Sequence, residues 1–235
     1  MKKAVFVALD YDNQKEVQKL LANLGRPEET YLKIGMELYY HYGAGLVTKL
    51  VKQGYHIFLD LKLHDIPNTV YQAARQIAHL GVYCTTIHAL GGSEMITAAK
   101  NGLKDGTAQG SEVPKLLAVT ELTSITAKVL STEQNCSLSM PEQVVSLAQT
   151  AKKAGADGVI CSPLEVKNLR KHFGSDFLYV TPGIRLTNKS NDDQKRIATP
   201  QKAKEFGSSA IVVGRPITQA KNPAQIYHEI KKEFE

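Results

Sequence analysis

The sequence predicts a single-domain (β/α)8 barrel that spans residues 1–235. Eight short apolar runs alternate with amphipathic stretches along the chain, which is the order of elements in such a barrel. The length of 235 residues also suits this fold, and no linker, low-complexity segment or repeat divides the chain. A doubly wound open sheet is the alternative, which the missing GxGxxG motif weakens.

The eight apolar runs are the predicted strands. Each is long enough for a strand and rich in valine, isoleucine, leucine or aromatic residues. In chain order they occupy residues 4–10, 31–35, 56–63, 83–89, 115–122, 157–163, 177–183 and 210–216.

Two of the segments between the strands show clear helical punctuation. In residues 66–81, Pro67 suits a first helical turn and Gly81 suits the stop after the last one. The same design recurs from Pro141 to Gly155. The apolar face of the first of these helices is formed by Val70, Ala74, Ile77 and either Ala78 or Leu80.

Composition and charge argue against several classes of protein. The formal net charge is +6, but lysines and arginines are scattered among acids and there is no Trp, so we expect no nucleic-acid partner. No apolar run approaches the ~20 residues that span a bilayer, and the first aspartate comes too early for a signal peptide, so we expect no membrane association. Three widely spaced cysteines favour a reducing, cytoplasmic location and argue against disulfides or structural zinc.

Ionisable and polar residues follow several of the predicted strands. Active sites of these barrels lie at the carboxyl ends of the strands, so residues from different strands meet there. Each alone has an ordinary structural explanation, such as capping a helix or pairing with a neighbouring charge. Together they favour a site: Asp10, Lys33, Asp60, Lys62, His88, Thr123, Arg185 and Arg215.

The third strand carries the sharpest signal. Side chains alternate across a strand, so Asp60 and Lys62 face one way while the neighbouring leucines face the outer helices. A lysine flanked by carboxylates keeps its ammonium form, which makes it a proton donor rather than a nucleophile. Asp65 follows the strand and either opens the next helix or belongs to the site.

The last two strands predict a phosphate pocket. Barrels of this class often bind phosphate with the loops after strands seven and eight. Gly214 contributes backbone N–H groups, and the Arg215 guanidinium is a fork suited to phosphate. The long polar loop over residues 183–200 is interpreted as a lid, although a merely flexible loop is the alternative.

Eight motifs, in order across nearly the whole chain, resemble the orotidine 5′-phosphate decarboxylase family. The Asp-x-Lys-x-x-Asp core of the third strand is the most specific of them. They read VALDYDN, YLKIGMELYYHYG, FLDLKLHDIPNT, TIHALGG, AVTELTS, TPGIR, DDQKRIATP and VVGRPI.

The resemblance implies decarboxylation of orotidine 5′-phosphate to uridine 5′-phosphate, without metal or organic cofactor. It implies that Lys62 protonates C6 of the pyrimidine and that Asp60 lies beside the departing carboxylate. Asp10 and Lys33 would hold the ribose hydroxyls, with Lys33 also joining the charges around Asp60. The remaining implied contacts are Thr123 and Gln194 to the ligand, Gly214 and Arg215 to the phosphate, and Arg185 near the same phosphate.

The resemblance also implies a homodimer, in which Asp65 and Thr69 reach into the partner's site. Two alternatives stay open. Related barrels with the same strand motif are magnesium-dependent sugar-phosphate decarboxylases or hexulose-phosphate synthases. The second alternative is a non-catalytic protein that binds phosphate ligands or nucleic acid. The intact set of Asp60, Lys62 and Asp65 argues against this alternative.

Overall fold

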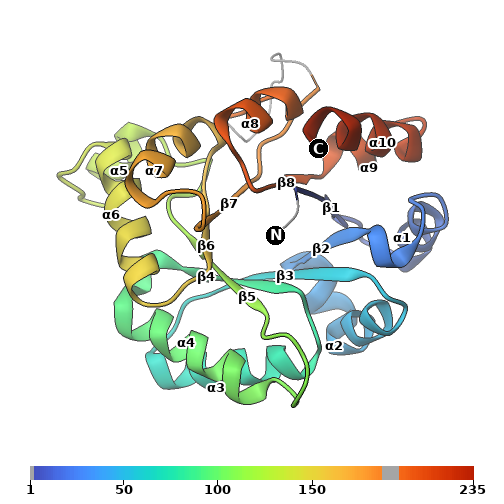
Figure 1. Cartoon of the computed structure of the whole chain (residues 1–235), viewed down its shortest axis with the longest axis horizontal. Coiled ribbons are helices and arrows are strands. Elements are labelled where there is room, and N and C mark those ends of the chain that lie inside the picture. The colour runs from blue at the N-terminus through green and yellow to red at the C-terminus, as the bar shows by residue number, and fades with distance from the viewer. Residues whose placement is uncertain (1–2, 187–195) are drawn as a thin grey trace.

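The computed structural model describes residues 3–186 and 196–235, and these form a closed barrel of eight parallel strands (Figure 1). Each strand pairs with its neighbour in sequence, and the first strand closes the ring against the last through Ala4 opposite Ala210. Helices surround the barrel on the outside (Figure 1). The predicted (β/α)8 fold class is confirmed, and the open-sheet alternative is wrong.

The strands lie where the sequence predicts them, but several end earlier. They are β1 Ala4–Ala8, β2 Tyr31–Gly35, β3 His56–Leu63, β4 Cys84–His88, β5 Lys115–Val119, β6 Gly158–Ile160, β7 Leu178–Thr181 and β8 Ala210–Val213. The residues lost from the predicted runs lie mainly at the carboxyl ends, where the chain turns into the loops above the barrel. Arg215, for example, begins a helix rather than ending a strand.

The helices and short 3-10 turns occupy the segments between the strands. The α-helices are α1 Gln14–Leu21, α2 Met36–Lys52, α3 Pro67–His79, α4 Gly92–Gly106, α5 Ala127–Thr132, α6 Met140–Lys153, α7 Val166–Phe173, α8 Pro200–Phe206, α9 Arg215–Thr218 and α10 Pro223–Phe234. The 3-10 turns are η1 Pro27–Glu29, η2 Ala89–Gly91 and η3 Pro163–Glu165.

The predicted helix punctuation and the predicted apolar face are confirmed. Pro67 begins α3, and Gly81 after its end has a φ of 72°. Of the two candidates for the end of the face, Ala78 is buried and Leu80 is only partly buried. The second helix, α6, begins one residue before Pro141. The buried face of α3 consists of Val70, Ala74, Ile77 and Ala78.

The barrel interior and the layer between strands and helices form two separate apolar cores. Alternation along β1 sends Phe6 inward and Val5 and Val7 outward. Inside, Phe6 and Phe58 meet edge to face with ring centroids 5.4 Å apart. The inner core holds Ala4, Phe6, Ala8, Phe58, Cys84, Leu117, Val180, Ala210 and Val212. The interior below the carboxyl ends of the strands is therefore filled with side chains.

Helices α3 and α4 approach each other closely through glycines. A Cβ atom added at Gly102 would lie 2.2 Å from the backbone oxygen of Tyr71, and one added at Gly106 would lie 2.2 Å from that of Arg75. Atoms cannot approach so closely, so the contact between these helices depends on the absence of a side chain at both positions.

We expect the Gly102→Ala substitution to destabilise the fold by about 1–3 kcal/mol, because α3 and α4 must separate to admit the methyl group. Gly45→Ala is the matched control, since Gly45 lies in α2 with open space around its added Cβ. Gly45 is exposed and lies two residues after Gly43, whose φ of 66° interrupts the helix, so that change should alter the free energy of unfolding by less than about 0.5 kcal/mol. Urea unfolding of both variants measures the two free energies, and a Gly102→Ala protein as stable as wild type would contradict the close contact.

Candidate active site

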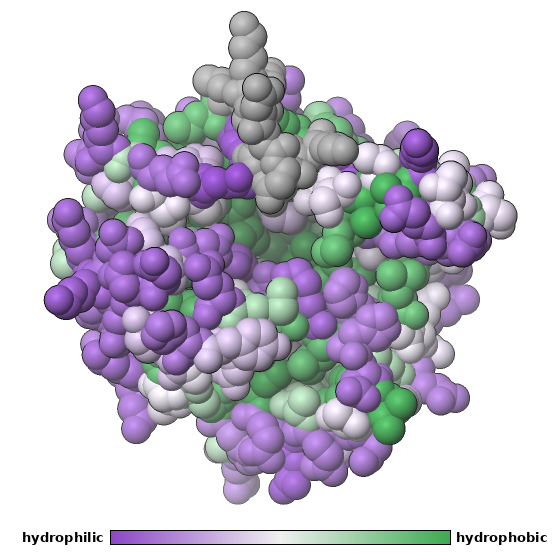
Figure 2. All heavy atoms as spheres, turned by 180° about the vertical axis from the view of Figure 1, so that it is seen from behind, coloured by the Kyte–Doolittle hydropathy of each residue, from purple (hydrophilic) through white to green (hydrophobic). Residues whose placement is uncertain are grey.

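A cavity of about 300 Å³ opens at the carboxyl ends of the strands. Phe58 and Val212 from the inner core line it, so the apolar packing of the barrel also supports the cavity. Figure 2 shows a hollow near the centre of one face of the molecule, apolar at its bottom and hydrophilic around it.

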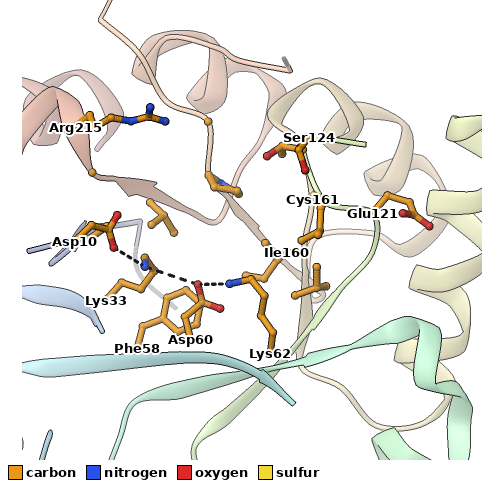
Figure 3. Close-up of a pocket in the computed structure, with 18 of the residues that line it drawn as sticks. Asp10, Lys33, Phe58, Asp60, Lys62, Glu121, Ser124, Ile160, Cys161 and Arg215 are labelled. Carbon is orange, nitrogen blue, oxygen red and sulfur yellow. Dashed lines mark hydrogen bonds and ion pairs between the residues drawn. The ribbon is translucent and has the colours of Figure 1, made fainter. Parts of the chain in front are cut away.

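Four ionisable side chains form a row of alternating charge in this cavity (Figure 3). The Lys33 ammonium lies 3.2 Å from Asp10 Oδ1 and 3.8 Å from Asp60 Oδ2. The Lys62 ammonium lies 3.0 Å from the same Oδ2 of Asp60. Two carboxylates and two ammonium groups therefore balance each other in charge.

The charges in this row must alternate because Lys33, Asp60 and Lys62 are largely shielded from water. The side chains of Lys33 and Asp60 are each 12% exposed and that of Lys62 is 26% exposed. Removing such a group from water costs several kcal/mol unless an opposite charge and hydrogen bonds compensate. Asp60 receives both ammonium groups on Oδ2, and its other oxygen, Oδ1, accepts a hydrogen bond from the Thr86 hydroxyl at 2.8 Å.

A bulge in β3 places Lys62. The register against β4 shifts between Leu59 and Leu63, so that Asp60, Leu61 and Lys62 lie opposite Thr86 alone. Lys62 has a φ of 52°, a conformation that few residues other than glycine adopt and that costs on the order of 1 kcal/mol. Its backbone N–H donates to Thr86 Oγ1 at 3.0 Å instead of to a strand carbonyl. Thr86 thus holds both the backbone of Lys62 and the carboxylate of Asp60.

Other predicted site residues line the two ends of the same cavity. Arg215 and Asp10 lie towards one end and Ser124 towards the other, with Lys62 between them (Figure 3). The predicted residues that line the cavity are Asp10, Lys33, Asp60, Lys62, Thr123, Arg185, Gly214 and Arg215. The structure therefore brings together the residues predicted from six strand ends.

Four predicted residues are not part of this group. His88 ends β4 and is not among the described residues that line the cavity. Asp65 and Thr69 are exposed and are not among the described residues that line the cavity. Asp65 Oδ1 accepts a hydrogen bond at 2.6 Å from the N–H of Ile66, which is the N-cap residue of α3. The Asp65 carboxylate therefore lies at the start of α3, although Asp65 precedes the N-cap residue by one position. Gln194 lies outside the described residues, as does the rest of residues 187–195 of the predicted lid.

Sequence reasoning missed several residues of the cavity wall. Most are apolar strand-end residues, whose pattern is the same as that of any core residue. Ser124 could have been found, because it extends the polar loop after β5 that also contains Thr123. The missed residues are Ala8, Phe58, Val119, Glu121, Leu122, Ser124, Ile160, Cys161, Pro182, Gly183 and Val212.

His88, Cys84 and Cys161 are poorly suited to act in charged form. Burial lowers the pKa of His88, and the nearby His64 and Lys62 lower it further, while Asp60 opposes them. The neutral imidazole of His88 is thus favoured. Burial also raises the pKa of the Cys84 and Cys161 thiols well above the usual range, so neither is a thiolate nucleophile at neutral pH.

Within residues 3–186 and 196–235, no group of three or more His, Cys, Asp or Glu side chains is arranged to hold a metal ion. The helices of the same two ranges include none that is long and apolar enough to cross a membrane.

The arrangement suits a reaction in which negative charge develops at one carbon and is then protonated. An ammonium group fixed by Asp60 and by the β3 bulge stabilises such charge without having to reorganise. The same group can supply the proton. Arg215 at the far end can bind a phosphate remote from the reacting atom.

Known proteins resemble this chain along its whole length. Residues 3–230 match the family described as Orotidine 5'-phosphate decarboxylase / HUMPS family. The chain is 64% identical over 234 residues to the orotidine 5′-phosphate decarboxylase of Lactobacillus gasseri and 63% identical to that of Lactobacillus johnsonii, with 100% of each chain covered in both cases. The crystal structure of orotidine 5′-phosphate decarboxylase from Lactobacillus acidophilus superposes with a TM-score of 0.90 at 60% identity, over 99% of both chains.

We expect Thr86→Val to lower the free energy of unfolding by about 1–3 kcal/mol, because the buried Asp60 Oδ1 and the Lys62 N–H both lose their partner. Thr85→Val is the matched control, since Thr85 is equally buried but donates only to the neutral carbonyl of Leu59. Its loss should be smaller, about 1 kcal/mol. Urea unfolding at neutral pH compares them, and equal losses would mean that Thr86 does not support the charged row.

Proposed function

Because the chain belongs to the orotidine 5′-phosphate decarboxylase / HUMPS family, we propose that it decarboxylates orotidine 5′-phosphate to uridine 5′-phosphate, the last step of UMP synthesis. It is a carboxy-lyase, and residues 1–235 act as one catalytic domain. The observation that carries the proposal is the row of alternating charge Asp10–Lys33–Asp60–Lys62, in a cavity that has Arg215 at one end.

Lys62 is the proton donor in this proposal. Loss of carbon dioxide breaks the bond from C6 to the carboxylate and leaves the electron pair on C6 of the pyrimidine. The Lys62 ammonium, 3.0 Å from Asp60, stabilises that charge and then transfers its proton to C6. Asp60 lies beside the carboxylate that departs, where its negative charge opposes the substrate's charge but not the neutral carbon dioxide. Lys33 forms an ion pair with Asp60 from the other side, at 3.8 Å.

The remaining contacts follow the length of the cavity. Asp10 and Lys33 bind the ribose hydroxyls, because they lie between Lys62 and Arg215 (Figure 3). Arg215, the backbone at Gly214 and Arg185 bind the phosphate. Binding energy from this remote group can order the site around the reacting carbon.

The base lies at the other end, against the loop after β5. Thr123 in that loop hydrogen-bonds the edge of the pyrimidine. Gln194 bridges from the loop after β7 to the ligand in this proposal, although it lies outside the described residues.

We also propose a homodimer in the cytoplasm, in which Asp65 and Thr69 complete the partner's site. Both residues are exposed and follow β3. Large apolar side chains are exposed in the same region after three consecutive strands: Met36 after β2, Ile66 after β3 and Leu90 after β4, at 43%, 67% and 45% exposure. Large apolar side chains exposed after neighbouring strands favour an interface between subunits.

The reaction itself is tested by following the ultraviolet absorbance of orotidine 5′-phosphate with purified protein and excess chelator. We expect turnover that the chelator does not affect, because the proposed chemistry uses only side chains of the protein. A magnesium-dependent sugar-phosphate decarboxylase or hexulose-phosphate synthase would lose its activity on its own substrates under these conditions. Absence of turnover on orotidine 5′-phosphate would refute the proposal.

Lys62→Ala should abolish decarboxylation while binding of UMP remains measurable, because the proton donor is lost but the ends of the cavity are intact. Lys115→Ala is the matched control, since Lys115 lies at the amino-terminal end of β5. Turnover and isothermal titration with UMP distinguish the two variants. Near-normal turnover of Lys62→Ala would show that another group donates the proton.

Mixing of inactive variants tests the shared site. Lys62→Ala and Asp65→Ala homodimers should each be nearly inactive. After unfolding and refolding of an equal mixture, about half the dimers are mixed, and one of their two sites is intact, so activity should return to about a quarter of wild type.

The control mixture combines Asp60→Ala with Lys62→Ala. Both residues come from the same chain, so every site of a mixed dimer keeps one lesion and no activity should return. Failure of the Lys62→Ala and Asp65→Ala mixture to recover, like this control, would place Asp65 in the site of its own chain.

A further inference from the structure

Arg196 is a largely buried cation behind the cavity wall that the proposed reaction does not use. Its side chain is 17% exposed, and it is not among the described residues that line the cavity. The guanidinium pairs through Nη1 with Glu165 Oε1, and the Glu165 side chain is 12% exposed. Nη2 donates to the carbonyl of Leu122 at 2.9 Å and to that of Glu121 at 3.4 Å.

These contacts join the loops that follow three consecutive strands. Glu121 and Leu122 follow β5, and Glu165 ends the η3 turn that follows β6. The carbonyl of Arg196 accepts from Ser162 Oγ at 3.4 Å. Arg196 itself belongs to the connection after β7.

That connection is fixed beside Arg196 by backbone hydrogen bonds. The N–H of Arg185 donates to the carbonyl of Ala198 at 2.9 Å, and the N–H of Ala198 donates to the carbonyl of Gly183 at 3.1 Å. The backbone of Arg196 is therefore anchored two residues away, so its side chain reaches the β5 loop from a fixed base.

The acidic side chains around Arg196 favour a cation at its position. Burial raises the pKa of Glu165 and the Glu121 carboxylate adds to this effect, whereas Arg196 and hydrogen bonds from Ser162 and Arg196 lower it. Glu121 is 2% exposed and is held by the amides of Gln134 and Gln143 at 3.3 and 3.4 Å. The guanidinium thus pairs with the largely buried carboxylate of Glu165, and its removal would deprive that carboxylate of this cation.

We propose that Arg196 is a positioning residue that holds the β5 loop in place, and with it Thr123 and Ser124. These two residues line the cavity and directly follow the carbonyls to which Arg196 donates. Arg196 acts through the backbone and touches no substrate atom. The inference rests on the proposed function in one respect, that this wall of the cavity faces the pyrimidine. Glu165 holds the guanidinium in the orientation that reaches the two carbonyls.

The experiment compares Arg196→Gln with wild type in binding of UMP and of ribose 5-phosphate, which lacks the base. We expect UMP affinity and kcat/KM on orotidine 5′-phosphate to fall about 10- to 100-fold, the scale of a site group displaced by about 1 Å. Affinity for ribose 5-phosphate should not change, because the phosphate and ribose contacts lie at the other end of the cavity. Arg196→Lys keeps the charge but not the hydrogen bonds from both sides of the guanidinium. Its UMP affinity and its kcat/KM should therefore lie between those of wild type and those of Arg196→Gln.

Lys100→Gln is the matched control. The Lys100 side chain is also 17% exposed and forms an ion pair with Asp157 at 2.5 Å, away from the cavity. It should lose stability as Arg196→Gln does but keep wild-type affinity for UMP. Equal loss of affinity for UMP and ribose 5-phosphate in Arg196→Gln, or no loss for either, would overturn the inference. If Arg196→Gln does not fold, Arg196→Lys and Glu165→Gln are compared with Lys100→Gln in the same way.

Hydrogen exchange over residues 119–126 separates this inference from the proposed reaction. We expect these amides to exchange faster in Arg196→Gln than in wild type or in Lys100→Gln, whatever the substrate of the protein is. Unchanged exchange would refute the positioning role even if decarboxylation is found. Absence of turnover by wild type together with faster exchange in the variant would refute only the proposed reaction.

Discussion

The carboxylate of Asp60 is the group on which the rest of the site depends. It is 12% exposed and receives two ammonium groups on one oxygen and the Thr86 hydroxyl on the other. A buried carboxylate is tolerated only with such compensation, so Lys33 and Lys62 are held where Asp60 requires them. The stability of the barrel and the placement of the proposed proton donor thus rest on the same contacts.

The interior of the barrel is apolar towards the amino-terminal ends of the strands and carries the charged row at their carboxyl ends. Towards the amino-terminal ends, the rings of Phe6, Tyr31 and Tyr83 pack edge to face and tilted against one another, leaving the inward positions apolar. Towards the carboxyl ends, Phe58 and Val212 form the last apolar layer beneath the charged row. The strained backbone of Lys62 lies at this boundary, and Thr86 on the next strand compensates it. The strained backbone of the proposed proton donor is therefore supported by the same threonine that bonds to Asp60.

An ion pair also holds the site in place from behind the cavity wall, where its residues do not touch a ligand. Arg196 and Glu165 form a buried pair that ties together the loops after β5, β6 and β7. Loops are the variable and mobile part of such barrels, and a wall made of loops keeps its shape only where such contacts fix it. The proposed reaction therefore draws on ion pairs at two levels, one within the cavity and one behind it.

The sequence by itself determined the order of strands and helices, the inward direction of Asp60 and Lys62 and the common edge at which Asp10, Lys33, Thr123 and Arg215 meet. Periodicity and punctuation are local, and the closure of eight parallel strands brings their carboxyl ends together. Only the tertiary structure decided the rest: where each strand stops, the bulge at Lys62 opposite Thr86, and the partners of Arg196. Thr86 is 26 residues from Asp60 and Glu165 is 31 from Arg196. No pattern in the chain encodes pairs at such separations, because they form only when the closed barrel fixes the distance between neighbouring strand ends.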